Sequence, residues 1–496
     1  MRACHQQHLL QRQRGRFHVP DSRAAFTIVP VTQQSRQLNR YRAVVQASSA
    51  TAITTKTVHM PNSKSKSLPF FTNDLDDSPT ESASESQLLK PFTNATYKAL
   101  QVIERGMHSG EGIQGCSIYT GTAGVAYMFL RLAESLQYTQ QKLADHPDQV
   151  FANLDAACLL NRAEEYGHWA KHLSHCGKHE KRVSFLEGHP GCLAVQTAIA
   201  SLRGKKVQAK HCLQELESWG SRVLNMPSAE CEILYGRCGY LHALLFARKY
   251  AGPSPDTQQL IKQLLQQIVE EGQRGTAQLR SMGNTSWDLM WSWHGSYYLG
   301  GAHGVCGILL TLMQCHPELE ELYPGQATPL LMGVLGGLMT QILPSGNLLS
   351  SLGSESDKYV QWCHGAPGLI PVLTKAYQLL DDSSPEHAAG REQILAAARK
   401  AADVVWERGL LTKGMGLCHG MSGNAYALLS LYHVTKEDLY KCRAQQFGQF
   451  MADHCKELQD VPDAPLSLYE GLGGAVCFWM DVLAPEHAAS FPGYEL

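Results

Sequence analysis

The chain has 496 residues, of which 44% are hydrophobic and 18% charged, which is enough apolar material for one large buried core. A formal net charge of −2 gives no electrostatic basis for binding nucleic acid or an anionic membrane, so we expect a small-molecule or peptide partner. The 15 cysteines lack the spacing of a disulfide framework and indicate free thiols in a reducing compartment, and no apolar run is long enough to predict a transmembrane helix.

The first 59 residues differ in composition from the rest of the chain. Residues 1–59 contain eight Arg and one Lys against a single acidic residue, Asp21, and show little periodicity. This composition is typical of an organelle transit peptide, and a start of translation at Met60 is the alternative. We predict a cytoplasmic location, including peripheral association with the plasma membrane, or a plastid or mitochondrion if residues 1–59 are a transit peptide.

A flexible arm is predicted over residues 60–86, because the segment is rich in Ser, Asp and Asn and includes Pro. The first amphipathic helix is predicted over residues 87–107. The folded domain is therefore expected to span residues 87–496.

A Gly-x-x-Gly step followed by an apolar segment of helical length recurs seven times in this domain. The steps lie at Gly121/Gly124, Gly188/Gly191, Gly236/Gly239, Gly304/Gly307, Gly365/Gly368, Gly420/Gly423 and Gly471/Gly474. The segments directly after the steps, such as residues 125–130, are apolar almost all round and predict buried inner helices. The segments between, such as residues 260–270, are amphipathic and predict outer helices. The alternation predicts an all-α fold, an α/α toroid (barrel) of seven inner and seven outer helices.

The residue before the first glycine of each step is polar in every repeat, although a buried helix follows. These residues are Thr120, Glu187, Tyr235, His303, His364, His419 and Glu470. Glycine lets seven helix ends crowd toward one axis, because it has no side chain and adopts positive φ. We expect the seven polar side chains to ring the axial mouth of the toroid.

Two of the steps begin with the same sequence, Cys-His-Gly. Cys363-His364-Gly365 and Cys418-His419-Gly420 place two thiols and two imidazoles in the same local frame, at the starts of two inner helices. Sulfur and nitrogen donors favour Zn²⁺ in a protein with no sign of redox chemistry. Three protein ligands would leave a fourth position open, which indicates catalysis or thiol binding. Two buried thiols without a metal are the structural alternative.

These motifs resemble those of eukaryotic lanthionine synthetase C-like (LanC-like) proteins. The resemblance covers about residues 87–496 and includes the seven glycine steps in order. The local sequences that carry it are Trp362-Cys-His-Gly-Ala-Pro-Gly368, Lys413-Gly-Met-Gly-Leu-Cys-His-Gly420, Gly301-Ala-His-Gly304, Ser467-Leu-Tyr-Glu-Gly471 and the ending Phe491-Pro-Gly-Tyr-Glu-Leu496.

The resemblance implies a zinc ion held by Cys363, Cys418 and His419. It also implies that the protein adds a thiol, with glutathione as the expected nucleophile, to dehydroalanine or dehydrobutyrine in a peptide or protein, forming a thioether. The donor set suits this chemistry, because zinc depresses the pKa of a bound thiol and the thiolate is the attacking nucleophile.

The resemblance implies roles for three further residues. His303, in the Ala-His-Gly motif, is the candidate general acid that protonates the α-carbon after attack. Lys413 resembles the family lysine that contacts glutathione, and it would pair with a carboxylate or stabilise the enolate. Asp463 is expected to accept a hydrogen bond from the glutathione amine. A packing histidine and a solvated lysine are the structural alternatives for His303 and Lys413.

Two further positions near these motifs, His364 and Asp460, have no assigned catalytic role. His364 lies outside the implied ligand set, and we expect it to support the metal site or the local fold. Asp460 stands where glutathione-binding animal members carry an arginine, which leaves the identity of the thiol open.

Two other functions compete with the enzyme. A zinc- and glutathione-binding signalling or adaptor module would need the metal ligands but tolerate loss of His303. A glycoside hydrolase would need two carboxylates across the mouth, for which Glu187 and Glu470 are the candidates, and would leave the cysteines unexplained.

Contacts with the acceptor are expected in the two longest intervals between motifs. These are residues 131–184 and residues 249–300, the latter with Trp287, Trp291 and Trp293, which the sequence suggests are exposed.

Overall fold

The computed structural model describes residues 68–78, 85–110, 113, 115–144, 155–174, 182–226, 230–284, 286–381, 384–486 and 490–496. The transit peptide predicted over residues 1–59 and the alternative start at Met60 lie outside the described residues. The compact unit runs from Leu68 to Leu496. Within the described part of it, extended structure is limited to isolated β-bridges, and no helix is long and apolar enough to cross a membrane.

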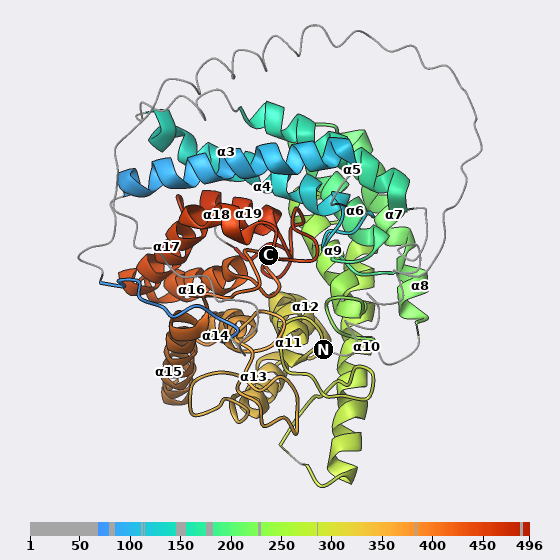
Figure 1. Ribbon diagram of the computed structural model, residues 1–496. Helices are drawn as coiled ribbons and strands as arrows, with labels where there is room; N and C mark the ends of the chain where they lie inside the picture. The colour runs from blue at the N-terminus through green and yellow to red at the C-terminus, as the bar shows by residue number, and fades with distance from the viewer. Residues whose placement is uncertain are drawn as a thin grey trace, which may run out of the picture. The chain divides into compact units, whose positions relative to one another are not determined.

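Seven buried helices begin directly after the first glycine of the seven glycine steps, so that the second glycine lies in the first turn of each helix. They are α4 (Thr122–Ala144), α6 (His189–Leu202), α9 (Arg237–Ala251), α11 (Val305–Gln314), α14 (Ala366–Leu379), α16 (Met421–Thr435) and α19 (Leu472–Asp481). Each of them packs against the next in this order, and α19 packs against α4. The inner helices therefore close into a ring (Figure 1).

The outer helices cover this ring from outside. They are α3 (Glu85–Ser109), α5 (Ala156–Ser174), α7 (Lys206–Ser218) with the short α8 (Gly220–Leu224), α10 (Pro255–Ser281), α13 (Ala327–Met339) after the short α12 (His316–Leu322), α15 (Pro385–Arg408) and α17 (Asp438–Asp453) with the short α18 (Cys455–Leu458). Six of the seven pack on the inner helix that precedes them, and α3 packs on α19. Across the described residues the fold is the predicted α/α toroid of seven inner and seven outer helices.

The outer helices α10 and α15 show how the sequence sets these elements. Ser254 and Ser384 precede them, and each hydroxyl accepts a hydrogen bond from a backbone N–H three residues later, while proline follows each serine. One face of α10 is buried, including Ile261, Leu264 and Ile268, because the spacing of three and four residues puts these side chains on one side of the helix.

The C-terminal segment, residues 490–496, fills the centre of the ring, where Figure 1 marks the end of the chain. Phe491 and Tyr494 are fully buried. The Tyr494 hydroxyl donates to the carbonyl of Gly368 at 2.8 Å, and the Tyr469 hydroxyl donates to the carbonyl of Pro492 at 2.8 Å. The Gln314 amide donates to the Tyr494 carbonyl at 3.1 Å. The tail therefore links three inner repeats to one another and forms the floor beneath the mouth.

A buried ion pair holds the start of this tail. Arg131 of α4 contacts Asp481 of α19 at 2.5 Å, and it also donates to the carbonyl of Ser490 at 3.1 Å. Asp481 accepts further hydrogen bonds from Ser135 at 2.5 Å and Tyr426 at 2.7 Å. A buried carboxylate is tolerated here because three donors satisfy it.

Residues 68–78, part of the segment for which the sequence predicts a flexible arm, lie along the outside of the ring. Phe71 is buried, and its ring centroid lies 5.6 Å from that of Phe450 in α17. Asp77 pairs with Arg443 of α17 at 2.8 Å. Composition gave no signal for this packing, because a single buried phenylalanine anchors a largely polar segment.

Removing the anchor of the tail should weaken the whole ring. We expect Phe491→Ala to lower the free energy of unfolding by about 3 to 5 kcal/mol, because it leaves a cavity among fully buried aromatic rings. Denaturant unfolding measures this, with Leu496→Ala as the control, since Leu496 is 37% exposed. Equal stability of the two variants would show that the tail does not support the ring.

Candidate metal centre

The loop before each inner helix folds back on itself in the same way in all seven repeats. A Cβ on the second glycine of each step would overlap the carbonyl oxygen of the residue six positions earlier, as for Gly368 against Trp362 and Gly423 against Leu417. Only glycine fits this close approach. The seven steps found in the sequence are therefore a packing requirement of one repeated turn.

The residues two positions before the first glycines join neighbouring repeats through their backbones. The N–H of Cys363 donates to the carbonyl of Cys418 at 3.3 Å, and the N–H of Cys418 donates to the carbonyl of Tyr469 at 2.8 Å. In the same way the N–H of Tyr469 donates to the carbonyl of Tyr119 at 3.0 Å, and the N–H of Tyr119 donates to the carbonyl of Leu186 at 2.9 Å. We call these five residues the backbone arc. It fixes Cys363 and Cys418 as neighbours at equivalent positions of adjacent repeats.

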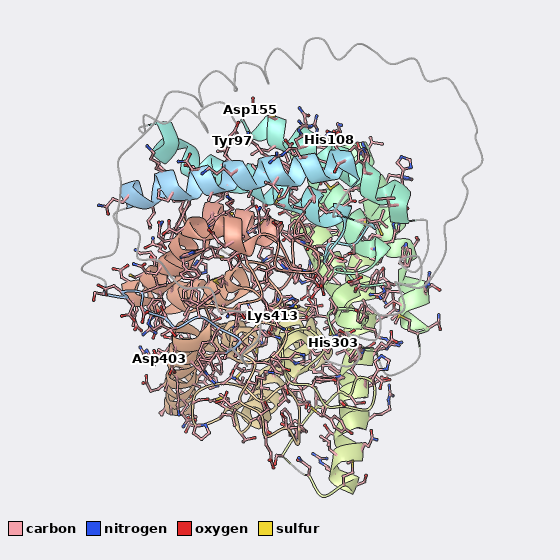
Figure 2. The ribbon with its side chains drawn as sticks, viewed as in Figure 1. Tyr97, His108, Asp155, His303, Asp403 and Lys413 are labelled. Carbon is pink, nitrogen blue, oxygen red and sulfur yellow. The ribbon has the colours of Figure 1, made fainter. Side chains whose placement is uncertain are left out.

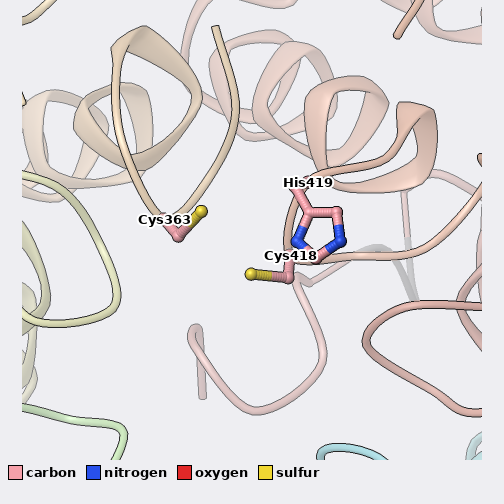
Figure 3. A group of neighbouring side chains, drawn as sticks. All are labelled: Cys363, Cys418 and His419. Atoms are coloured by element: carbon pink, nitrogen blue, oxygen red, sulfur yellow. The ribbon is translucent and has the colours of Figure 1, made fainter. Parts of the chain in front are cut away.

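The backbone arc brings together the three residues that the LanC-like resemblance names as ligands. The Sγ atoms of Cys363 and Cys418 and a ring nitrogen of His419 all lie within 4.8 Å of one another. Figure 3 shows both sulfur atoms and the imidazole facing a common space, with Cys363 from the loop before α14 and the other two from the loop before α16. Both cysteines are buried, at 8% and 4% exposure.

The chemistry of this donor set fits a zinc ion. The hydrogen bond from Cys418 lowers the pKa of Cys363 well below the ordinary thiol value, while burial raises the pKa of Cys418. Cys363 thus loses its proton easily, whereas Cys418 keeps its proton. For Cys418 to become a second buried thiolate beside the first, a cation must lie between them. A dication with an affinity for sulfur and nitrogen supplies that charge, as expected for zinc. In addition, the Gln361 amide donates to the Cys363 sulfur at 3.2 Å and orients it.

Tyr119 lies beside the cysteines, and the sequence analysis missed it. Its hydroxyl is hydrogen bonded to the Cys418 thiol, and burial, followed by the charge of Cys418, raises its pKa well above the usual value. Its ring stacks on Tyr469 with centroids 4.9 Å apart. The signal was available, because Tyr119 occupies the position of Cys363 and Cys418 in the first repeat.

His303 lies next to this centre because its loop packs directly on the Cys363 loop. The N–H of Gly301 donates to the carbonyl of Trp362 at 3.1 Å, and Gly300 lies against the Cys363 backbone. The His303 side chain is buried, and Figure 2 labels it, with Lys413, toward the middle of the ring. The structure thus brings His303 to the same mouth as the three candidate ligands.

Glu232 orients His303, and it too was missed from the sequence. Its carboxylate contacts His303 Nδ1 at 3.1 Å and accepts the backbone N–H groups of Leu234 at 2.8 Å and Tyr235 at 2.7 Å. In three other repeats a serine four positions before the first glycine accepts the N–H of the residue three positions later, as Ser184 does. A carboxylate at this position satisfies the turn and also reaches the imidazole.

Trp293 covers one face of the His303 ring. The two ring centroids are 3.8 Å apart and their planes differ by 7°. A short hairpin holds the indole, since Trp293 and Ser296 exchange backbone hydrogen bonds at 2.9 and 3.0 Å across a turn with positive φ at His294 and Gly295. Carboxylate and indole together restrict the imidazole to one orientation.

Trp287 and Trp291 correct a sequence expectation. The sequence suggests three exposed tryptophans in the interval 249–300, but Trp287 is 1% and Trp291 6% exposed. Trp291 donates to the carbonyl of Ile268 at 2.8 Å and packs beside Gly272 of α10. These two rings fill the space between the interval and α10 or α13, and only Trp293 faces the mouth.

His364 lies near both the candidate acid and the candidate lysine, because the charges of His303 and Lys413 act on it. Burial lowers its pKa, the Cys363 charge opposes this, and the charges of His303 and Lys413 lower it further. Its ring centroid lies 5.8 Å from that of Tyr298. His364 is not part of the group that could hold a metal among the described residues.

Lys413 and Asp463 lie on adjoining loops, the first of which leads to Cys418. Lys413 is half-buried, and no hydrogen bond or ion pair of its ammonium group is found within the described ranges. Asp463 and Asp460 are exposed. The two loops pack closely at Pro462 and Gly414, since a Cβ added to Gly414 would lie 3.2 Å from the ring of Pro462. No contact between Asp463 and the metal group is found in the described part of the chain.

The two acidic residues considered for a hydrolase, Glu187 and Glu470, belong to the glycine turns. Glu187 pairs with Arg182 at 3.0 Å, and its N–H is bound by Ser184 at 3.1 Å. The N–H of Glu470 is bound by Ser467 at 3.2 Å in the same way.

Comparisons with known proteins identify the family of the chain. The family model of the lanthionine synthetase C-like proteins matches residues 112–496. A zebrafish (Danio rerio) protein named glutathione S-transferase LANCL1 is 32% identical over 403 residues, covering 80% of this chain and 89% of its own. LanC-like protein GCL1 of Arabidopsis thaliana is 31% identical over 435 residues, covering 84% and 91%.

Among solved structures, nisin cyclase aligns with a TM-score of 0.54 at 14% identity, over 81% of this chain and 97% of its own. At this identity the similarity establishes the toroid fold alone. The fold and its mouth define an α/α-toroid protein with a cysteine- and histidine-rich centre. The chain belongs to the lanthionine synthetase C-like family.

Loss of one thiol should empty the centre of metal. We expect Cys418→Ser to lower bound zinc from about one ion per chain to a small fraction of that, because the hard hydroxyl replaces a soft ligand. Elemental analysis of the purified protein measures this, with Cys158→Ser as the control, since Cys158 is exposed and distant in sequence from the group. Full zinc occupancy in the Cys418 variant would contradict the assignment.

Proposed function

We propose that the protein adds a thiol, with glutathione as the nucleophile, to dehydroalanine or dehydrobutyrine in a peptide or protein and so forms a thioether. The observation that carries this proposal is the convergence of two thiols and one imidazole within 4.8 Å, at the same mouth as the His303–Glu232 pair. The first group suits activation of a thiol, and the second suits delivery of a proton.

Cys363, Cys418 and His419 would hold Zn²⁺ at this mouth. A zinc ion supplies a Lewis acid that lowers the pKa of a thiol and stabilises the thiolate. Gln361 and Tyr119 hold the two cysteine sulfurs in place through their hydrogen bonds. The backbone arc prevents the two loops from separating.

The reaction requires one proton to be removed and one to be delivered. The thiolate sulfur attacks the β-carbon of the dehydroamino acid, forming the C–S bond, while the electron pair of the C=C bond moves to the α-carbon and its carbonyl as an enolate. His303 then delivers a proton to the α-carbon. The thiol loses one proton and the α-carbon gains one, so the thioether contains all the atoms of the two reactants.

Glu232 and Trp293 prepare His303 for this step. The carboxylate accepts a hydrogen bond from Nδ1 at 3.1 Å, which leaves Nε2 as the nitrogen that exchanges a proton with the substrate. The carboxylate on one side and the indole on the other hold the imidazole in one orientation for this step.

Lys413 is suited to bind an anion beside the centre. Its ammonium group has no hydrogen-bond or ion-pair partner within the described residues, and its charge acts on His364 at the mouth. It would bind a glutathione carboxylate or stabilise the enolate. The name glutathione S-transferase of the zebrafish relative supports glutathione as the thiol. The exposed Asp463 would accept from the glutathione amine, and Asp460 adds a second negative charge in that loop.

The competing proposal, a zinc- and glutathione-binding module without turnover, explains the metal group but not the proton donor. A binder has no use for an imidazole fixed by a carboxylate at 3.1 Å and by an indole at 3.8 Å. This pair favours the enzyme.

Intact-mass analysis of a dehydroalanine peptide with glutathione tests the proposed reaction. We expect an adduct to form faster than in an enzyme-free blank, and kcat to fall about 10² to 10⁴-fold in His303→Gln while zinc is retained, because the proton donor is lost. The peptide without dehydroalanine is the substrate control. No adduct above the blank from zinc-loaded protein would favour the binding module.

The role of Glu232 can be separated from that of His303 by pH. We expect Glu232→Gln to move the alkaline limb of the pH–rate profile to lower pH, because the imidazolium loses its anionic partner. Glu187→Gln is the matched control, since Glu187 contacts Arg182. An unchanged pH profile in the Glu232 variant would show that its carboxylate serves the turn alone.

A further inference from the structure

Residues 68–78, which we call the strap, run along the loop that leads to Lys413. Phe70 and Leu411 form an antiparallel β-bridge. The N–H of Phe71 donates to the carbonyl of Leu410 at 2.7 Å. The N–H and the hydroxyl of Thr412 both donate to the carbonyl of Pro69, each at 3.1 Å. These contacts end at the residue before Lys413.

The strap is anchored away from the loop as well. The Asn73 amide donates to the carbonyl of Trp406 at 2.6 Å, and the Asn73 side chain also accepts the N–H of Leu75 at 3.1 Å. Phe71, buried against Phe450, and the ion pair of Asp77 with Arg443 tie it to α17. In Figure 1 it is the blue segment on the α15 to α17 side of the ring.

The Lys413 backbone is thereby held from both sides. Upstream, the strap fixes residues 410–412. Downstream, Gly414 has φ of 106°, and its carbonyl accepts the N–H of Met421 at 3.1 Å. A Cβ added to Gly414 would lie 3.2 Å from the ring of Pro462, so the backbone has little room to move there. The downstream contacts belong to the glycine turn of the sixth repeat. Upstream, Leu410 and Leu411 are buried, and the hydrogen bonds of residues 410–412 that are found among the described residues are made with the strap.

We propose that the strap is a positioning element for the thiol site, which sets the position of Lys413 and thus the affinity for the anionic thiol. This inference rests on the proposed function. The strap touches neither the metal group nor His303 in the described residues, so its release changes thiol binding and leaves metal binding and proton delivery in place. Any event that detaches residues 68–78 would weaken use of the thiol at this site.

Two matched pairs of variants test this inference. Phe71→Ala removes the anchor and Phe71→Leu keeps an apolar side chain, while Thr412→Val removes the hydroxyl bond to Pro69 and Thr412→Ser keeps it. We expect Phe71→Ala to raise KM for glutathione about tenfold, and Thr412→Val about threefold, because a less fixed binding group loses affinity. In both variants kcat and zinc content should stay within about twofold of the parent value. The conservative variants should restore KM.

Hydrogen exchange provides a measurement that does not depend on turnover. The Thr412 amide is bonded to Pro69, so Phe71→Ala should speed exchange of residues 410–412 about tenfold or more, while exchange in α11 stays unchanged. If the parent protein forms no thioether, the proposed function fails. The role of the strap is then still decided by this exchange and by whether bound glutathione protects Lys413 from an acylating reagent.

Three results would overturn the inference. The first is an unchanged glutathione KM in Phe71→Ala although exchange of residues 410–412 is accelerated. The second is unchanged exchange in that variant. The third is a fall in kcat and zinc content together with the rise in KM, which Phe71→Leu does not restore. The last would mean that the strap only supports the fold.

Discussion

The backbone arc is the constraint on which the candidate centre depends. Four hydrogen bonds of 2.8 to 3.3 Å join equivalent residues of five consecutive repeats around the ring, starting at Cys363 and ending at Leu186. They form because each loop folds onto its own glycine, which brings the start of every inner helix close to the axis. A cysteine at two adjacent positions of such an arc must meet its neighbour. The candidate metal group therefore depends on the fold, which brings the two Cys-His-Gly motifs together.

The mouth is asymmetric, and this asymmetry organises the chemistry. The fifth and sixth repeats supply sulfur and imidazole, while the third and fourth supply Glu232 and His303 with Trp293 stacked on the ring. Lys413 enters from the loop before the sixth repeat. In the proposed reaction, activation of the thiol, binding of its anion and delivery of the proton would therefore fall to neighbouring sectors of one ring. The C-terminal tail closes the space beneath them through Phe491 and Tyr494.

The sequence predicted the features that repeat along the chain. Glycine steps and apolar segments defined the toroid, and Cys-His-Gly in two repeats singled out the residues that the structure brings together. Contacts between distant segments escaped it. Glu232 and His303 are 71 residues apart, and the strap meets Thr412 across 343 residues, so no local pattern records either contact. The burial of Trp287 and Trp291 could not be predicted either, because the length of an interval does not reveal what packs beneath a loop.

X-ray absorption at the zinc edge tests whether two cysteines and one histidine hold a zinc ion with room for a substrate thiol. We expect two sulfur scatterers and one histidine in the protein alone, and one additional sulfur after glutathione is added. A spectrum with two sulfur scatterers that glutathione leaves unchanged would contradict thiol activation at this centre. A spectrum without sulfur scatterers would contradict the assignment of Cys363 and Cys418 as ligands.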